Sequence, residues 1–165
     1  MSELLKLSFS KVFRMIRRFI LMAVLLLSMA LTISAQQVVS GNYLGQFTRI
    51  YMNGEKKVGA KDFTAKVSQS GSSINLHIDA FKLGRMPGNV TINANNIVLK
   101  PDGSFSQTVD KGILIKILWK RTAYSAKVSG KIVNNVLNFT VTSINASYLG
   151  ISFTASISFK GTKQA

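Results

Sequence analysis

The stretch Ile-Ser-Phe-Thr-Ala-Ser-Ile-Ser-Phe, residues 151–159, has an apolar side chain at every second position and a hydroxyl side chain at each position between. A period of two puts all the apolar side chains on one face of an extended strand. Strands with one apolar and one polar face are typical of antiparallel sheets that cover a core on one side. The stretch therefore predicts a β-strand that faces a core.

The same alternation recurs along the chain after residue 40, where no stretch keeps a helical period. Turn sequences separate the runs: Asn53-Gly54, Ser-Gly-Ser-Ser at 70–73, Pro101-Asp102-Gly103 and Asn134-Asn135. We predict strands at 42–52, 56–69, 73–81, 88–93, 95–100, 104–110, 113–119, 121–133, 136–144 and 149–160, with the short middle segments able to merge.

Consecutive hairpins with short turns form a meander, and a long meander must protect its two edge strands. Closure into a barrel removes both edges. The sequence therefore predicts an all-β fold, an antiparallel up-and-down β-barrel of about 8–10 strands, with a β-sandwich as the alternative. A barrel of this size is either filled by side chains or holds one small ligand.

Ahead of this domain, the fifteen uncharged residues Phe19 to Ile33 follow five basic ones, Lys6, Lys11, Arg14, Arg17 and Arg18. Ser34 and Ala35 then supply the small residues of a cleavage site, so residues 1–35 are predicted to be a secretory signal peptide and 36–165 the exported domain. The alternative is an uncleaved anchor, but fifteen residues make a helix of about 22 Å, short for a hydrocarbon core of about 30 Å.

The signal peptide predicts a location in the periplasm or outside the cell. A lipoprotein anchor is not expected, because it requires a cysteine and the chain has none. Residues 1–35 carry five of the 21 basic residues and one of the six acids, which leaves the exported part with 16 basic and 5 acidic residues, a net charge of +11. Such a charge attracts anionic surfaces of the cell envelope, or it is simply a solvated face. We expect no nucleic acid partner, because there is no recognition motif, and no stable membrane span in the exported form.

The segment 112–119, Gly-Ile-Leu-Ile-Lys-Ile-Leu-Trp, departs from the alternation because both of its faces are apolar. One interpretation is a strand that is covered on both sides. The other is an exposed apolar patch at one end of the barrel or on a partner surface.

The motif Phe81-Lys-Leu-Gly-Arg-Met-Pro-Gly88, together with Gly41-Asn-Tyr43 and Gly103-Ser-Phe105, resembles the calycin-like domain of exported Bacteroidales proteins over about residues 40–162. The resemblance implies a lipocalin-like barrel and supplies neither a reaction nor a ligand. Lipocalins open with Gly-x-Trp under a basic residue of the last strand. Here Tyr43 replaces the tryptophan, and Lys160 is the expected basic partner.

The ligand-binding candidates are the apolar and aromatic side chains at the 81–88 turn and on the neighbouring strands: Phe81, Leu83, Met86, Trp119 and Tyr124. The alternative for the turn is that Phe81 and Met86 plug the barrel end.

We predict that the chain is not an enzyme and needs no cofactor. His77 and Asp79 share one face of a strand, but the row Asn75-His77-Asp79 is expected to be a solvated exterior face, and a dyad would still need a nucleophile. No second histidine or cysteine supports a metal site in the exported domain.

The sequence thus favours an exported lipocalin-like binding protein for a small apolar or amphipathic ligand. The alternative is a structural or interaction protein of the cell envelope with a filled barrel and a basic surface. An interior filled by Phe63, Phe105, Phe139 and Phe153 would contradict the ligand-binding hypothesis, whereas a continuous cavity of a few hundred cubic ångströms would support it.

Overall fold

A computed structural model describes residues 16–17, 22, 38–56, 62–82, 88–148 and 150–165. The contacts of the chain divide it into two compact units, Met1–Gln36 and Gln37–Ala165. The predicted signal peptide lies almost entirely outside the described residues and stays a prediction.

No helix within the described ranges is both long enough and apolar enough to cross a membrane.

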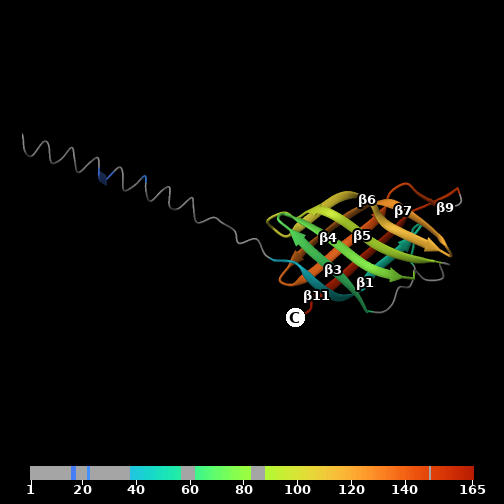
Figure 1. The fold of residues 1–165 in the computed structure, drawn as a ribbon, viewed down its shortest axis with the longest axis horizontal. Coiled ribbons are helices and arrows are strands. Elements are labelled where there is room, and N and C mark those ends of the chain that lie inside the picture. Colours follow the sequence, from blue (N-terminus) through green and yellow to red (C-terminus); the bar gives the residue numbers. More distant parts are fainter. Residues whose placement is uncertain (1–15, 18–21, 23–37, 57–61, 83–87, 149) are drawn as a thin grey trace, which may run out of the picture. The chain divides into compact units, whose positions relative to one another are not determined.

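The described part of the second unit is built from strands (Figure 1). In chain order these are β1 (Gly41–Met52), β2 (Glu55–Lys56), β3 (Asp62–Ser70), β4 (Ser73–Phe81), β5 (Asn89–Val98), β6 (Ser104–Ile117), β7 (Lys120–Val133), β8 (Val136–Ser143), β9 (Ala146–Tyr148), β10 (Ile151–Phe153) and β11 (Ala155–Lys163).

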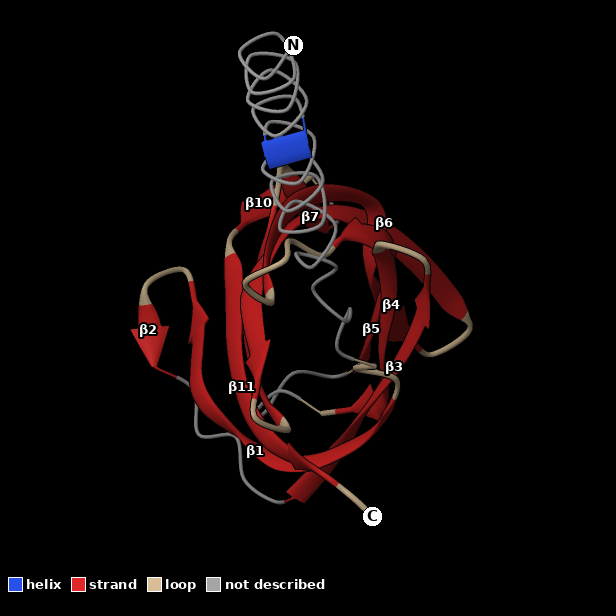
Figure 2. Ribbon diagram, turned by 90° about the vertical axis from the view of Figure 1, so that its left-hand side faces the viewer, coloured by secondary structure: helices blue, strands red, loops and turns tan. Residues whose placement is uncertain are grey.

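Eight of these strands form a closed antiparallel barrel in the order β11-β8-β7-β6-β5-β4-β3-β1, which the pairing of β1 with β11 completes. Figure 2 looks along the barrel and shows the strands as a ring. The predicted all-β, antiparallel up-and-down barrel is confirmed. The short β2 pairs with the end of β1, and β9 and β10 form a separate hairpin.

Several strand boundaries differ from the prediction because single residues with positive φ bend a strand without ending it. The predicted strands 88–93 and 95–100 are one strand, β5, in which Asn96 has φ 55° and donates its N–H to the side chain of Asn75. The predicted strands 104–110 and 113–119 are likewise one strand, β6, with a bulge at Lys111, φ 56°.

Two other predicted strands divide instead. The segment 56–69 becomes β2 and β3, with 57–61 outside the described residues, and the segment 149–160 becomes β10 and β11. β6 ends at Ile117, so that Leu118 and Trp119 form a two-residue turn rather than the end of a strand.

The seam between the first and last barrel strands depends on two facing glycines. Gly45 pairs with Gly161 in the β1–β11 ladder. A Cβ at Gly45 would overlap the carbonyl oxygen of Lys160, so only glycine allows the two backbones to approach this closely.

Candidate functional site

The barrel has two unlike ends. At one end lie the connections 71–72, 99–103 and 134–135 together with both ends of the domain, and we call this the closed end. At the other lie the connections 53–61, 82–88, 118–119 and 144–154, and we call this the long-loop end. A site that admits a ligand is expected where connections are long and can vary.

The closed end is sealed by the segment that leads into β1. The Tyr43 hydroxyl donates a hydrogen bond to the Val39 carbonyl at 2.8 Å, and the Val39 N–H donates to the Gln69 side chain at 2.9 Å. Tyr43 is fully buried, and burial raises the pKa of its hydroxyl. The expectation that Lys160 is the basic partner of Tyr43 is wrong. Lys160 is exposed on the outer face of β11, whereas Tyr43 faces the interior.

The interior of the barrel is packed with side chains from the closed end through the middle. Six inward-facing residues on three different strands have no exposed area, namely Ile74, Leu76, Ile92, Ala94, Leu137 and Val141. A space that could hold water would leave exposed area on the side chains that line it, so none opens beside these residues. Phe105 and Phe139 are also buried, as a filled interior requires.

Aromatic rings continue this packing toward the long-loop end. The ring of Phe47 lies 4.5 Å from that of Phe63 and 4.6 Å from that of Phe81, measured between centroids. Phe159 connects the group to Phe139, with centroids 5.3 Å apart. Offset and tilted contacts of this kind contribute about 0.5–1.5 kcal/mol each beyond burial.

Partly exposed apolar side chains on the inner side of the barrel gather at the long-loop end. Five of them pack on the core without being fully buried: Phe47, Met52, Phe63, Ile117 and Phe153. Four of them stand near the strand ends from which the long connections leave, and Phe47, in the middle of β1, contacts Phe63 and Phe81 at those ends. Apolar surface in contact with the core is therefore available at this end.

The predicted ligand-binding residues occupy different environments. Phe81 is 4% exposed and belongs to the aromatic group described above. Tyr124 is 8% exposed, donates its hydroxyl to the Ser147 carbonyl at 2.6 Å and meets the ring of Phe153 edge-on. Trp119 is 87% exposed at the β6–β7 turn. Leu83 and Met86 lie outside the described residues.

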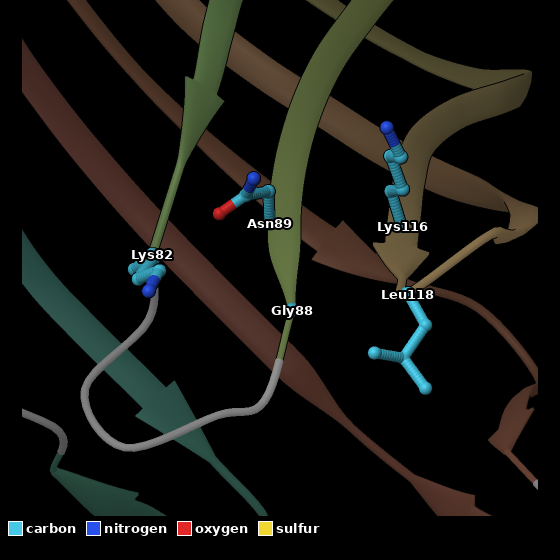
Figure 3. Close-up of a pocket in the computed structure, with 5 residues that line it drawn as sticks. All are labelled: Lys82, Gly88, Asn89, Lys116 and Leu118. Atoms are coloured by element: carbon cyan, nitrogen blue, oxygen red, sulfur yellow. The ribbon is translucent and has the colours of Figure 1, made fainter.

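A depression of about 390 Å³ lies on the outer side of the barrel at the long-loop end (Figure 3). Its lining comes from three neighbouring strand ends: Lys82 after β4, Gly88 and Asn89 at the start of β5, and Lys116 and Leu118 at the end of β6. Two ammonium groups, one amide and one aliphatic side chain suit an anionic group that is attached to an apolar one.

Sequence reasoning did not select this depression. The alternation of the strands places Lys116 and Asn89 on the outer face. That they are neighbours follows only from the structure, where they pair directly in the β5–β6 ladder. Phe47 was also missed, because the register shift between Phe47 and Arg49 interrupts the alternation of β1.

The polar row on β4 lies on the outside, as predicted. His77 Nε2 and Asp79 Oδ1 are 3.0 Å apart, and the Lys66 ammonium group lies 2.9 Å from Asp79 Oδ2. The hydrogen bonds from Lys66 and then from His77 lower the pKa of Asp79. The three side chains are 37–70% exposed, so the cluster is a solvated surface network. In the described part of the chain, no group of three or more His, Cys, Asp or Glu side chains is arranged to hold a metal ion.

Comparison with known proteins identifies one family. A family model described as "Calycin-like beta-barrel domain" matches residues 39–162, which include every barrel strand except the last residue of β11. Neither a curated protein nor a solved structure matches the chain.

Proposed function

Because the chain belongs to the calycin-like β-barrel family, we propose that it is an exported, non-enzymatic binding protein for a small apolar or amphipathic molecule. In this proposal, residues 1–35 are a cleaved signal peptide, and residues 36–165 work in the periplasm or outside the cell. The ligand binds at the long-loop end, not in the middle of the barrel.

One observation carries the proposal. The half-buried side chains Phe47, Met52, Phe63, Ile117 and Phe153 are clustered at this end, whereas the inner side chains toward the middle have almost no exposed area. An apolar chain or ring that covers them removes their apolar surface from water. This burial contributes about 25 cal/mol of binding free energy for each Å². Binding of this kind requires burial and no chemical step.

The packed interior favours a second candidate, an interaction protein of the cell envelope whose barrel holds nothing. Buried Phe105 and Phe139 support it, as does the net charge of +11 on residues 36–165. The two candidates differ in whether the long-loop end binds a small molecule.

Native mass spectrometry of the protein purified from its own host tests the first candidate. We expect a co-purifying lipid or other small amphipathic molecule, which is released when the protein is denatured. As a direct probe, the fluorescence of 8-anilinonaphthalene-1-sulfonate should rise on binding to the wild type and rise much less with Phe63→Ala. The matched control is Val98→Ala, because Val98 is 56% exposed and belongs to neither the core nor the long-loop end.

If no molecule co-purifies and Phe63→Ala binds the dye as the wild type does, the second candidate replaces the first. Far-UV circular dichroism of both variants establishes that the barrel has folded.

A further inference from the structure

The β6–β7 turn carries two large apolar side chains into solvent. Ile117 pairs with Lys120, so Leu118 and Trp119 form the turn between them. Leu118 is 73% and Trp119 is 87% exposed, and Trp119 is the one tryptophan of the chain. Neither side chain contributes to the core.

The backbone of this turn is also unfavourable for the residue that it holds. Leu118 has φ 52°, in the left-handed region that a branched, bulky side chain rarely adopts. The other hairpin turns with positive φ use asparagine or glycine there, as in Asn53-Gly54 and Asn134-Asn135. Strain and apolar exposure both act against stability, so the Leu-Trp pair is better explained by a contact outside the domain.

Basic side chains surround the turn. Lys116, Lys120 and Arg121 flank it in sequence, and Lys82 stands across the depression from Lys116 (Figure 3). All four are exposed, and none has an ion-pair partner within the described part of the chain. We call this surface the basic lip: Lys82, Lys116, Leu118, Trp119, Lys120 and Arg121.

A second apolar residue projects at the same end of the barrel. Ile151, which follows the turn of the β9–β10 hairpin, is 73% exposed. Figure 1 shows this hairpin and the end of β6 at the same end of the barrel.

We propose that the basic lip docks on the surface of an anionic phospholipid bilayer. Trp119 and Leu118 enter the headgroup region, and Lys82 and Lys116 bind lipid phosphate in the depression. The amphipathic indole ring favours the membrane interface, and the basic side chains favour anionic lipid. A soluble anion would occupy the depression and leave Trp119, which is not part of the lining, in water. The proposal needs no small molecule on the half-buried apolar side chains of the inner side of the barrel, so it stands independently of the function proposed above.

The test uses residues 37–165, which contain every barrel strand and all the described core residues, so that the apolar residues 19–33 cannot anchor the protein. Fluorescence of Trp119 reports on the lip alone, since the chain has no other tryptophan. We expect its emission to shift to the blue with vesicles that contain phosphatidylglycerol, and not with pure phosphatidylcholine or with inorganic phosphate. Sedimentation with the vesicles should weaken as salt rises, because salt screens the basic residues.

Two double variants separate the apolar contribution from the basic one. Leu118→Asn with Trp119→Gly removes both apolar side chains, places at residue 118 an asparagine that tolerates the positive φ, and should reduce sedimentation with anionic vesicles about tenfold or more. Lys82→Gln with Lys116→Gln should weaken it about 25-fold at low salt, about fivefold for each lysine. The controls are Val98→Ser for the apolar change and Lys127→Gln with Lys160→Gln for the charge change, because these residues are exposed on other surfaces.

Three outcomes would overturn the proposal: no sedimentation with anionic vesicles, equal loss in the lip variants and their controls, or a blue shift with inorganic phosphate alone. The last outcome would assign the depression to a soluble anion. Binding to anionic vesicles that only the lip variants lose would support the proposal, whether or not the dye binds at Phe63.

Discussion

The ring of Phe105 lies against the backbone of Gly130 on the next strand: a methyl group at Gly130 would come 2.7 Å from Cζ of Phe105. The same methyl group would overlap the Asn138 carbonyl oxygen. The absence of a side chain at Gly130 therefore makes the space in which the ring is buried.

Gly130→Ala is expected to destabilise the barrel by about 2–3 kcal/mol, because neither the ring nor the carbonyl can move away freely. Gly112→Ala is the matched control. Its nearest neighbour would be Ala126 Cβ at 3.2 Å, and we expect a loss below about 1 kcal/mol. Urea denaturation measures both, and equal losses would contradict the packing described here.

Tyr43→Phe removes the hydrogen bond to Val39 and should cost about 1 kcal/mol near neutral pH. Burial raises the pKa of Tyr43 above its usual 10.0, so the folded protein keeps the phenol proton at a pH where the unfolded chain has lost it. The wild type therefore loses stability above pH 10 through a group that the variant lacks.

The difference in unfolding free energy between wild type and Tyr43→Phe should be constant below pH 10 and shrink above it. Every other side chain is the same in the two proteins, so its contribution cancels in the difference. Denaturation at several alkaline pH values provides the measurement, and a constant difference would contradict the burial of this hydroxyl.

Lys66→Ala should raise the pKa of Asp79 toward 3.8, because the largest effect on this carboxylate is the hydrogen bond from Lys66. Since folding lowers this pKa, its contribution to stability is present above pH 3.8 and is lost as the pH falls through the folded value. Asp102 is the internal control, since hydrogen bonds from Ser104 lower its pKa. Carbon-13 NMR of the carboxyl groups follows both, and an unmoved Asp79 would mean that the ion pair does not form in solution.

Leu118→Asn should raise the stability of the barrel by about 0.5–1 kcal/mol, because asparagine tolerates positive φ better than leucine does. Leu118→Ala also removes the apolar side chain, but alanine tolerates positive φ less well than asparagine does, so the stability should be nearly unchanged. Chemical denaturation of the two variants distinguishes them. Equal stabilities would show that the turn is not strained at this residue.

Much of the fold follows from the sequence because side-chain alternation is a local property. The alternation of Ile157 and Phe159 with serine identifies the inner face of β11, and both residues are buried. The positions that local reasoning misjudged are those with an unusual backbone. Asn96 and Lys111 take positive φ inside continuous strands. The alternation of apolar and polar residues is interrupted near each of them, which in the sequence resembles the end of a strand.

The candidate surfaces were harder to predict, since they depend on which strands become neighbours. Lys82 and Lys116 are far apart in sequence. They line the same depression because β4 and β6 both lie beside β5 in the sheet. The exposed interpretation of the 112–119 segment holds for Leu118 and Trp119, whereas Ile113 and Ile115 are buried. The difference arises because the strand ends at Ile117 and the turn carries the last two residues away from the core.

The pairing of β1 with β11 has a consequence for the order of events during synthesis. The residues that complete the ring, 155–163, are synthesised after all the other barrel strands, and until they arrive β1 and β8 both keep an unpaired edge. The ring therefore stays open, with two edges that can pair with another chain, until β11 has been made.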